Sequence, residues 1–298
     1  MQGRTRRALL LVCGVALAAA ALTACSSASG QPPPTTATAS TPTALPTLEP
    51  EKQVVVKGKT LVTRCAGRGP SVILVSGYAS PMESWDPVQA RIAAGARTCT
   101  YDRLGIGLSD PPPDIQDFDD LAVQLDGVIT GLKLPRPVVV VAHSMGGPLA
   151  YTWAAAHPQD AHAMVLLDPS TPTYDAWFVT HLPKPDVGNP DISNLLRAVA
   201  FDRDPKTNRE SLDPKALDRV ARLPVVNVPM RIIEAGRDDG GPLPGMDSTA
   251  LREAWRAGHR WLAGRSSDGS VIVSQRSTHY VQGDDPDLVV KTVNEMLR

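Results

Sequence analysis

A serine lies at the point where a buried strand is expected to turn into a helix. The run Val138–Ala142 is apolar and rich in β-branched residues, HSMGG follows at 143–147, and Leu149–Ala156 favours a helix. Small residues two positions before and after the serine allow a strained turn without side-chain collision; Ala142 takes the place of the first, more usual glycine. The pattern predicts a nucleophile elbow that exposes Ser144 at a helix N-terminus, close to free backbone N–H groups.

A serine hydroxyl alone is a weak nucleophile. It needs a base within hydrogen-bond reach, and a third group must orient that base.

Several short apolar runs are rich in β-branched residues, among them 71–76, 138–142, 163–167 and 230–234. Runs that are apolar throughout favour strands buried on both faces, as in a parallel sheet covered by helices. The interval 169–228 is long and interrupted by proline, so we expect a lid inserted between two strands.

Four motifs in order make the chain resemble the α/β-hydrolase family over nearly all of residues 53–298. Besides the elbow, they are SGY at 76–78, YDRLGIGLSD at 101–110, and STHYVQ at 277–282 followed by Asp285-Pro286. The first resembles the family's oxyanion loop, with serine where histidine is usual. The resemblance implies an α/β fold: a mostly parallel eight-stranded sheet with helices on both faces and an inserted helical lid.

The general base is assigned to His279, which lies just after the last predicted strand, in the loop where the family's topology delivers a base. His143 adjoins Ser144 and should point away from its hydroxyl, so we predict a structural role for it. We interpret the other histidines as exposed or internally satisfied; they are His157, His162, His181 and His259.

The orienting acid has three candidates. Asp239 follows the predicted strand 230–234 in the family's G-x-x-D spacing and agrees with the chain order Ser, Asp, His. Asp238 replaces it if the register is shifted by one residue. Asp168 follows the preceding strand, although Leu167-Asp168-Pro169 is equally typical of a cap at the entrance to the lid.

The elbow predicts the backbone N–H of Met145 as one oxyanion donor, and the resemblance adds that of Tyr78. Asp102 and Arg103 are interpreted as a structural pair that braces the oxyanion loop. We expect neither a cofactor nor a metal.

The N-terminus has the layout of an export signal. Arginines at 4, 6 and 7 precede an apolar run at 8–22, and Leu22-Thr23-Ala24-Cys25 resembles the bacterial lipobox. Residues 1–25 are therefore expected to direct export, with Cys25 lipid-modified at the outer face of the bacterial cell membrane or envelope. The alternative is a plain signal peptide cleaved after Ala24. Residues 26–50, rich in Ser, Thr, Pro and Ala, predict a disordered tether before the hydrolase domain at 51–298.

Two cysteines, Cys65 and Cys99, remain after the signal and the lipobox are set aside. In an exported chain such a pair favours a disulfide, with two buried thiols as the alternative. The resemblance supports the disulfide because it places their strands side by side.

Charge and composition limit the function further. With 30 basic and 31 acidic residues, the chain lacks the basic excess of nucleic-acid-binding proteins, and 42% hydrophobic residues are too few for a multi-span membrane protein. We expect a monomeric serine hydrolase acting on a small-molecule or lipid ester or thioester. A carbon–carbon bond hydrolase, a cofactor-free peroxidase and a non-catalytic, surface-tethered binding protein remain as alternatives.

Overall fold

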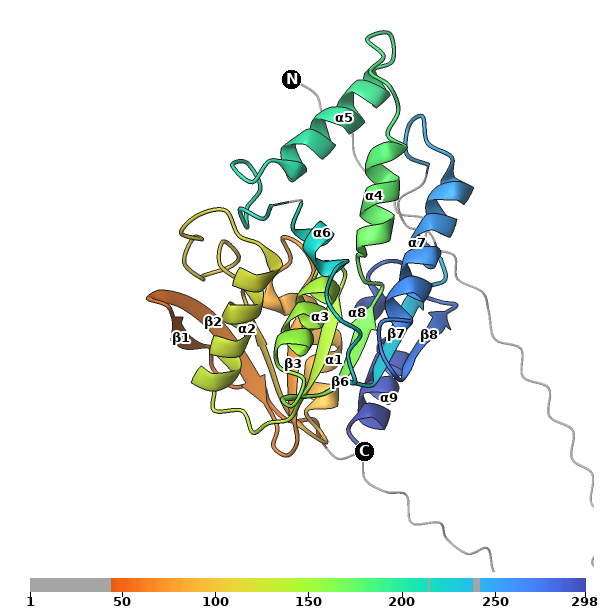
Figure 1. The fold of residues 1–298 in the computed structure, drawn as a ribbon. Helices are drawn as coiled ribbons and strands as arrows, with labels where there is room; N and C mark the ends of the chain where they lie inside the picture. The colour runs from red at the N-terminus through yellow and green to blue at the C-terminus, as the bar shows by residue number, and fades with distance from the viewer. Residues whose placement is uncertain (1–43, 214, 238–241) are drawn as a thin grey trace, which may run out of the picture. The chain divides into compact units, whose positions relative to one another are not determined.

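In the computed structural model, which describes residues 44–213, 215–237 and 242–298, one sheet organises the fold (Figure 1). Its strands follow the order β1-β2-β4-β3-β5-β6-β7-β8. They are β1 (Lys52–Val56), β2 (Lys59–Ala66), β3 (Ser71–Val75), β4 (Arg97–Tyr101), β5 (Val138–His143), β6 (Ala161–Leu167), β7 (Met230–Ala235) and β8 (Gly269–Ser274).

Only the first strands of this sheet run antiparallel. The strand β2 pairs antiparallel with β1 and β4. From β4 onward, the pairs β4–β3, β3–β5, β5–β6, β6–β7 and β7–β8 are all parallel. The predicted fold class, a mostly parallel eight-stranded sheet with helices, is confirmed. Parallel strands bring their carboxyl ends to one edge of the sheet, which is where such folds bind ligands.

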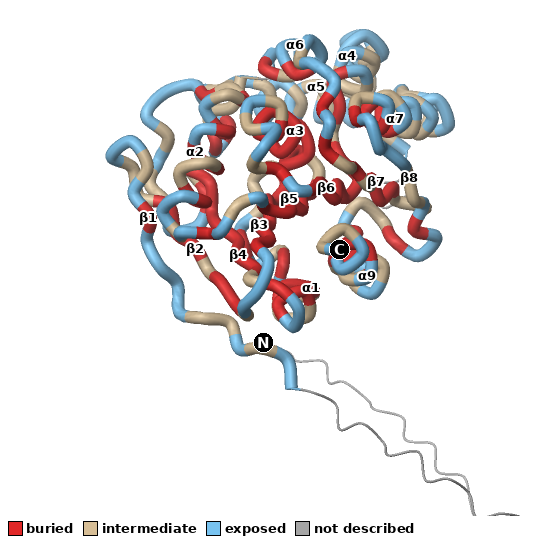
Figure 2. The backbone as a smooth tube through the Cα atoms, turned by 60° about the horizontal axis from the view of Figure 1, so that its bottom comes forward, coloured by how far each residue is buried: buried red, intermediate tan, exposed pale blue. Residues whose placement is uncertain are grey.

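Alternate residues of the central strands supply the cores on the two faces. Ile73 and Val75 belong to one buried cluster, while Val72 and Leu74 belong to the other. Side chains in a strand point alternately to opposite faces, so a strand that is covered on both sides must be apolar throughout. In Figure 2 the central strands are accordingly coloured as buried and lie in the middle of the domain.

Helices cover both faces. Those that contribute buried residues to the cluster containing Ile73 are α2 (Phe118–Gly131), α3 (Gly146–Ala156), α6 (Ala216–Val220) and α7 (Ser248–Ala263). The opposite face is covered by the 3-10 helix η1 (Met82–Trp85), α1 (Asp86–Ile92), α8 (Val281–Asp284) and α9 (Pro286–Met296).

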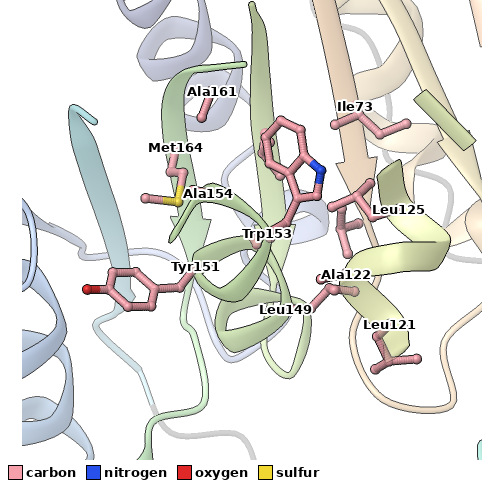
Figure 3. Close-up of a cluster of buried hydrophobic side chains, with 14 of the residues drawn as sticks. Ile73, Leu121, Ala122, Leu125, Leu149, Tyr151, Trp153, Ala154, Ala161 and Met164 are labelled. Carbon is pink, nitrogen blue, oxygen red and sulfur yellow. The ribbon is translucent and has the colours of Figure 1, made fainter. Parts of the chain in front are cut away.

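The packing between α2 and α3 fixes the helix that begins at the predicted elbow. Figure 3 shows Trp153 of α3 beside Leu125 of α2 and the sheet side chain Ile73, all of them buried. The indole N–H of Trp153 also donates a hydrogen bond to Asp126 Oδ1 at 3.2 Å. Because interiors are packed densely, this contact holds α3 in a defined position on the sheet.

The interval expected as a lid, which we call the insert (residues 169–228), connects β6 to β7. It contains α4 (Pro172–Thr180), α5 (Pro190–Arg203) and α6. Figure 1 shows α4 and α5 standing off the carboxyl edge of the sheet. The helix α5 has no buried residue, whereas Asn208 and Glu210, farther along the insert, are buried.

Cys65 and Cys99 are joined by a disulfide and face each other across the β2–β4 pair. Contacts with the domain begin before residue 51, since the Glu49 N–H donates to Cys65 O at 2.8 Å. Among the described residues, no helix has the length and apolar character needed to cross a membrane.

Candidate active site

Ser144 occupies the sharp turn between β5 and α3. Its φ of 51° lies in the left-handed region, which is unfavourable for a residue with a side chain. The turn is held by the Ser144 N–H, which donates to Leu167 O at 2.9 Å, and by the Gly147 N–H, which donates to Ser144 O at 2.9 Å. A Cβ on Gly146 would lie 2.7 Å from Val75 O, so the second small position of the motif is required by close packing.

His279 and Asp168 continue from this serine as a chain of hydrogen bonds. His279 Nε2 lies 2.9 Å from Ser144 Oγ, and His279 Nδ1 lies 2.7 Å from Asp168 Oδ2. The three residues follow β8, β5 and β6, whose carboxyl ends share one edge of the sheet. The predicted nucleophile and base are thus brought together with one of the three candidate acids.

The other two candidate acids, Asp238 and Asp239, lie outside the described residues. Asp168 itself has the left-handed φ of 43° and is buried. Its Oδ1 accepts hydrogen bonds from the backbone N–H of Ala235 at 2.9 Å and from the indole N–H of Trp255 at 3.0 Å. These bonds leave Oδ2 directed at His279.

The pKa of Asp168 is lowered although the group is buried. Burial raises this pKa, but the hydrogen bond with His279, the positive potential of His259 and His279 and the bond from Ala235 N–H together outweigh it. The side chain is therefore a carboxylate at neutral pH, which is the form that orients a histidine and stabilises its protonated state.

A second buried pair, His259 and Glu234, lies behind Asp168. His259 Nδ1 is 2.9 Å from Glu234 Oε2, and its Nε2 is 3.1 Å from Pro169 O and 3.9 Å from Asp168 Oδ1. The histidine is fully buried and its ring nitrogens have partners within the protein, so of the two predicted states, exposed or internally satisfied, it has the second. Its position beside the acid was not foreseen. The i, i+4 spacing of Trp255 and His259 on α7 is the only local signal for it.

The predicted oxyanion donors come from the turn itself and from the loop after β3. Met145 directly follows Ser144 and is the N-cap of α3. Tyr78 is the third residue after the end of β3. A Cβ on Gly77 would lie 3.2 Å from Ser144 Cβ, so the loop before Tyr78 packs against the elbow. Within the described part of the chain, neither backbone N–H donates a hydrogen bond to another protein group.

Asp102 and Arg103 contact the oxyanion loop and the segment after it. Arg103 Nη1 and Nη2 donate to Ser76 O and Gly77 O, each at 2.6 Å. Asp102 Oδ1 accepts from the Met82 N–H at 2.7 Å. These are the contacts of a structural brace.

One cluster in the described residues has the composition of a metal site. Ligand atoms of Asp126, His157 and Asp160 lie within 4.8 Å of one another. Arg136, however, forms ion pairs with both carboxylates at 2.7 and 2.5 Å, which offsets part of the negative charge that would attract a cation. The cluster is best described as a surface ion-pair network.

His143 contacts the backbone of the predicted base, His279. Its Nε2–H donates to His279 O at 2.8 Å, and burial followed by the positive potential of His279 lowers its pKa to about 4, from the ordinary 6.5. The side chain therefore stays neutral near pH 7. This agrees with a structural role rather than a chemical one.

The lowered pKa of His143 predicts a loss of stability in acid. Between pH 6.5 and 4 the unfolded chain binds a proton at this residue and the folded chain does not, so acidification favours unfolding. We expect His143→Gln to lose about 3 kcal/mol less unfolding free energy than the wild type between pH 7 and pH 4. Urea titrations at each pH measure this, and parallel pH profiles of the two proteins would contradict it.

Comparisons with known proteins agree with the fold. The family model of the alpha/beta hydrolase fold matches residues 70–217. An uncharacterised protein of Bacillus subtilis, YqjL, is 24% identical over 243 residues, which span 80% of this chain and 88% of the relative. The non-heme chloroperoxidase CPO-A1 of Kitasatospora aureofaciens is 42% identical over 82 residues, which are 27% of this chain and 30% of the relative.

A solved structure extends the likeness to most of the domain. The crystal structure of Cfl2 from Burkholderia cenocepacia superposes with a TM-score of 0.59 at 18% identity, covering 83% of this chain and 95% of the other. With the matched family model, the strand order and the elbow between β5 and α3, this chain belongs to the α/β-hydrolase fold family.

Proposed function

We propose that this protein is a serine hydrolase that cleaves carboxylic esters or thioesters through an acyl-enzyme. The observation that carries the proposal is the unbroken hydrogen-bonded chain from Ser144 Oγ through His279 to Asp168 Oδ2, with distances of 2.9 and 2.7 Å. A nucleophile, a base and an orienting acid in this arrangement are the parts that acyl transfer requires.

The reaction follows from the roles of these groups. Ser144 Oγ attacks the acyl carbon while its proton passes to His279 Nε2, and Asp168 stabilises the resulting imidazolium. The N–H groups of Met145 and Tyr78 hold the oxyanion, and His279 then protonates the leaving alcohol or thiol. Water, deprotonated by His279, attacks the acyl-enzyme in the same way and releases the carboxylic acid and Ser144.

A serine at the elbow supports ester chemistry over reactions that begin from an aspartate nucleophile, as in related dehalogenases and epoxide hydrolases. The similarity to a chloroperoxidase over residues that form part of the domain favours one second candidate, a cofactor-free peroxidase with the same three groups. Both reactions require Ser144, so activity on an ester and activity with peroxide must be measured on the same preparations.

Replacing the nucleophile tests the reaction. We expect Ser144→Ala to reduce hydrolysis of a short p-nitrophenyl ester by at least about 10⁴-fold, because the covalent step is lost. Its melting temperature should stay near that of the wild type, since alanine has a similar size. Labelling with a fluorophosphonate probe should mark Ser144 in the folded wild type alone; a folded, unlabelled wild type would favour the non-catalytic binding protein.

The acid is tested by comparing three matched substitutions. We expect Asp168→Asn to lower kcat by about 10³–10⁴-fold, because an amide in its place favours the wrong tautomer of the histidine. Asp238→Asn and Asp239→Asn serve as the comparison and should lose less activity. A larger loss in either of these than in Asp168→Asn would transfer the role of the acid to that residue.

We also propose that the protein is exported and anchored to the outer face of the membrane through lipid on Cys25. The arginines, the apolar run and the sequence LTAC at 22–25 support this proposal. More than one acyl chain on the cysteine would provide stable anchoring, whereas a single chain holds only marginally.

Substitution of the cysteine tests the anchor. In a bacterial host, the wild type should incorporate labelled palmitate and sediment with membranes, whereas Cys25→Ser should do neither. Cys65→Ser is the control, because it removes a different cysteine and should leave lipid incorporation intact. Equal incorporation by the wild type and Cys25→Ser would rule out lipidation at this residue.

A further inference from the structure

A buried carboxylate of the insert contacts the oxyanion loop. Glu210 is fully buried, and its partner Arg103 is 2% exposed. Arg103 Nε donates to Glu210 Oε2 at 2.6 Å, and Arg103 Nη2 donates to Oε1 at 2.9 Å. The same Oε1 accepts the backbone N–H of Ala79 at 2.7 Å. One side chain thus binds both the loop itself and the arginine that braces it.

The arginine controls the direction of the predicted oxyanion donor. Its guanidinium donates to Gly77 O at 2.6 Å. Because a peptide unit is planar and trans, the N–H of Tyr78 points away from the Gly77 carbonyl and therefore away from Arg103. The other side of Gly77 packs against Ser144, where a Cβ would be 3.2 Å from the Ser144 Cβ. The contact with Arg103 thus fixes the orientation of the peptide that carries this N–H, in a loop that packs against the elbow.

The residue after Tyr78 is held by the glutamate directly. Ala79 has a φ of 53°, in the left-handed region that is costly for alanine. A strained residue keeps such a conformation only where its surroundings hold it, and the hydrogen bond from Ala79 N–H to Glu210 supplies this restraint. Glu210 and Arg103 therefore fix the peptides on both sides of Tyr78.

The glutamate is itself rigidly placed on the core. Gln116 Nε2 donates to Glu210 O at 2.6 Å. The backbone of Gln116 donates to Ser211 O and accepts from the Asp213 N–H, both at 2.8 Å. A Cβ on Gly105 would lie 2.2 Å from Arg209 O, so Arg209, the residue before Glu210, packs directly on the YDRLGIGLSD segment at 101–110. This end of the insert is part of the core rather than of a freely opening lid.

We propose that Glu210 is a positioning residue for catalysis: through Arg103 and Ala79 it orients the Tyr78 N–H toward the oxyanion. The inference rests on the proposed acyl transfer and adds a residue of the insert to it. A preorganised donor lowers the barrier because it needs no rearrangement as charge develops on the oxygen. The insert therefore contributes to the chemical step.

The test compares Glu210→Gln with a control in the same insert. The substitution keeps the size of the side chain but removes the charge and one acceptor. We expect kcat for a short p-nitrophenyl ester to fall by about 10-fold or more, with KM changed little, because the oxyanion forms only in the transition state. Affinity for an alkyl boronate, which forms a tetrahedral adduct with the serine, should fall by a similar factor.

Asp175→Asn is the matched control. Asp175 pairs with Arg203 at 2.5 Å within the insert and has no contact with the oxyanion loop among the described residues. It should lower the stability of the insert and leave kcat and boronate affinity near the wild-type values. Equal losses in the two variants would mean that Glu210 acts only through the general stability of the insert, and would overturn the inference.

A second variant covers the case in which Glu210→Gln does not fold. Glu210→Asp keeps the charge beside Arg103 but is too short to reach both Arg103 and the Ala79 N–H, so kcat should still fall. A folded Glu210→Asp with unchanged kcat and boronate affinity would overturn the inference.

One measurement is independent of the reaction. The amide NMR signals of Tyr78 and Ala79 should shift, and exchange faster with solvent, in Glu210→Asp but not in Asp175→Asn. Unchanged signals would overturn the positioning role even if no ester is found to be a substrate. A wild type with the expected NMR behaviour but no labelling of Ser144 would instead count against the proposed acyl transfer alone.

Discussion

The left-handed backbone of Ser144 is the constraint on which the rest of the site depends. A residue with a side chain keeps this unfavourable conformation only where interactions with its surroundings hold it there. Here β5 delivers the chain into the turn, and the hydrogen bond from Ser144 N–H to Leu167 O fixes it to β6. The small residue Gly146 then lets α3 start directly against the carbonyl of Val75. The serine is presented at the sheet edge where β6 and β8 also end.

Charged side chains near that edge are each hydrogen-bonded to partners within the protein. Asp168 is hydrogen-bonded to His279 and accepts hydrogen bonds from the backbone N–H of Ala235 and the indole N–H of Trp255. Arg103, on the other side of the elbow, is paired with Glu210. Breaking a buried pair by removing one partner leaves an uncompensated charge, which is far more costly than losing a surface ion pair. The buried pair of Arg103 and Glu210 therefore holds its surroundings in one arrangement, which a preorganised site requires.

Local patterns and the family resemblance together predicted the fold and part of the site. Apolar strands, the small residues around Ser144 and the order of four motifs predicted the sheet, and the structure has the predicted fold class. The elbow pattern predicted Ser144, and the family resemblance predicted His279; the two side chains lie at hydrogen-bond distance. The acid was harder, because aspartates follow both β6 and β7. Spacing along the chain favoured Asp239, whereas only Asp168 of the three candidates lies within the described residues, in contact with His279.

What the sequence by itself determined is the set of local conformations: which segments are strands, where the elbow turns, and which histidine follows the last strand. Those features depend on residue size, periodicity and neighbours in the chain. Only the tertiary structure decided which acid meets His279 and which further distant groups surround the site. Glu210 is 107 residues from Arg103, and Trp255 is 87 residues from Asp168, yet both are hydrogen-bonded pairs. No spacing rule connects residues on separate elements, because their contact is set by how the insert and α7 pack on the sheet.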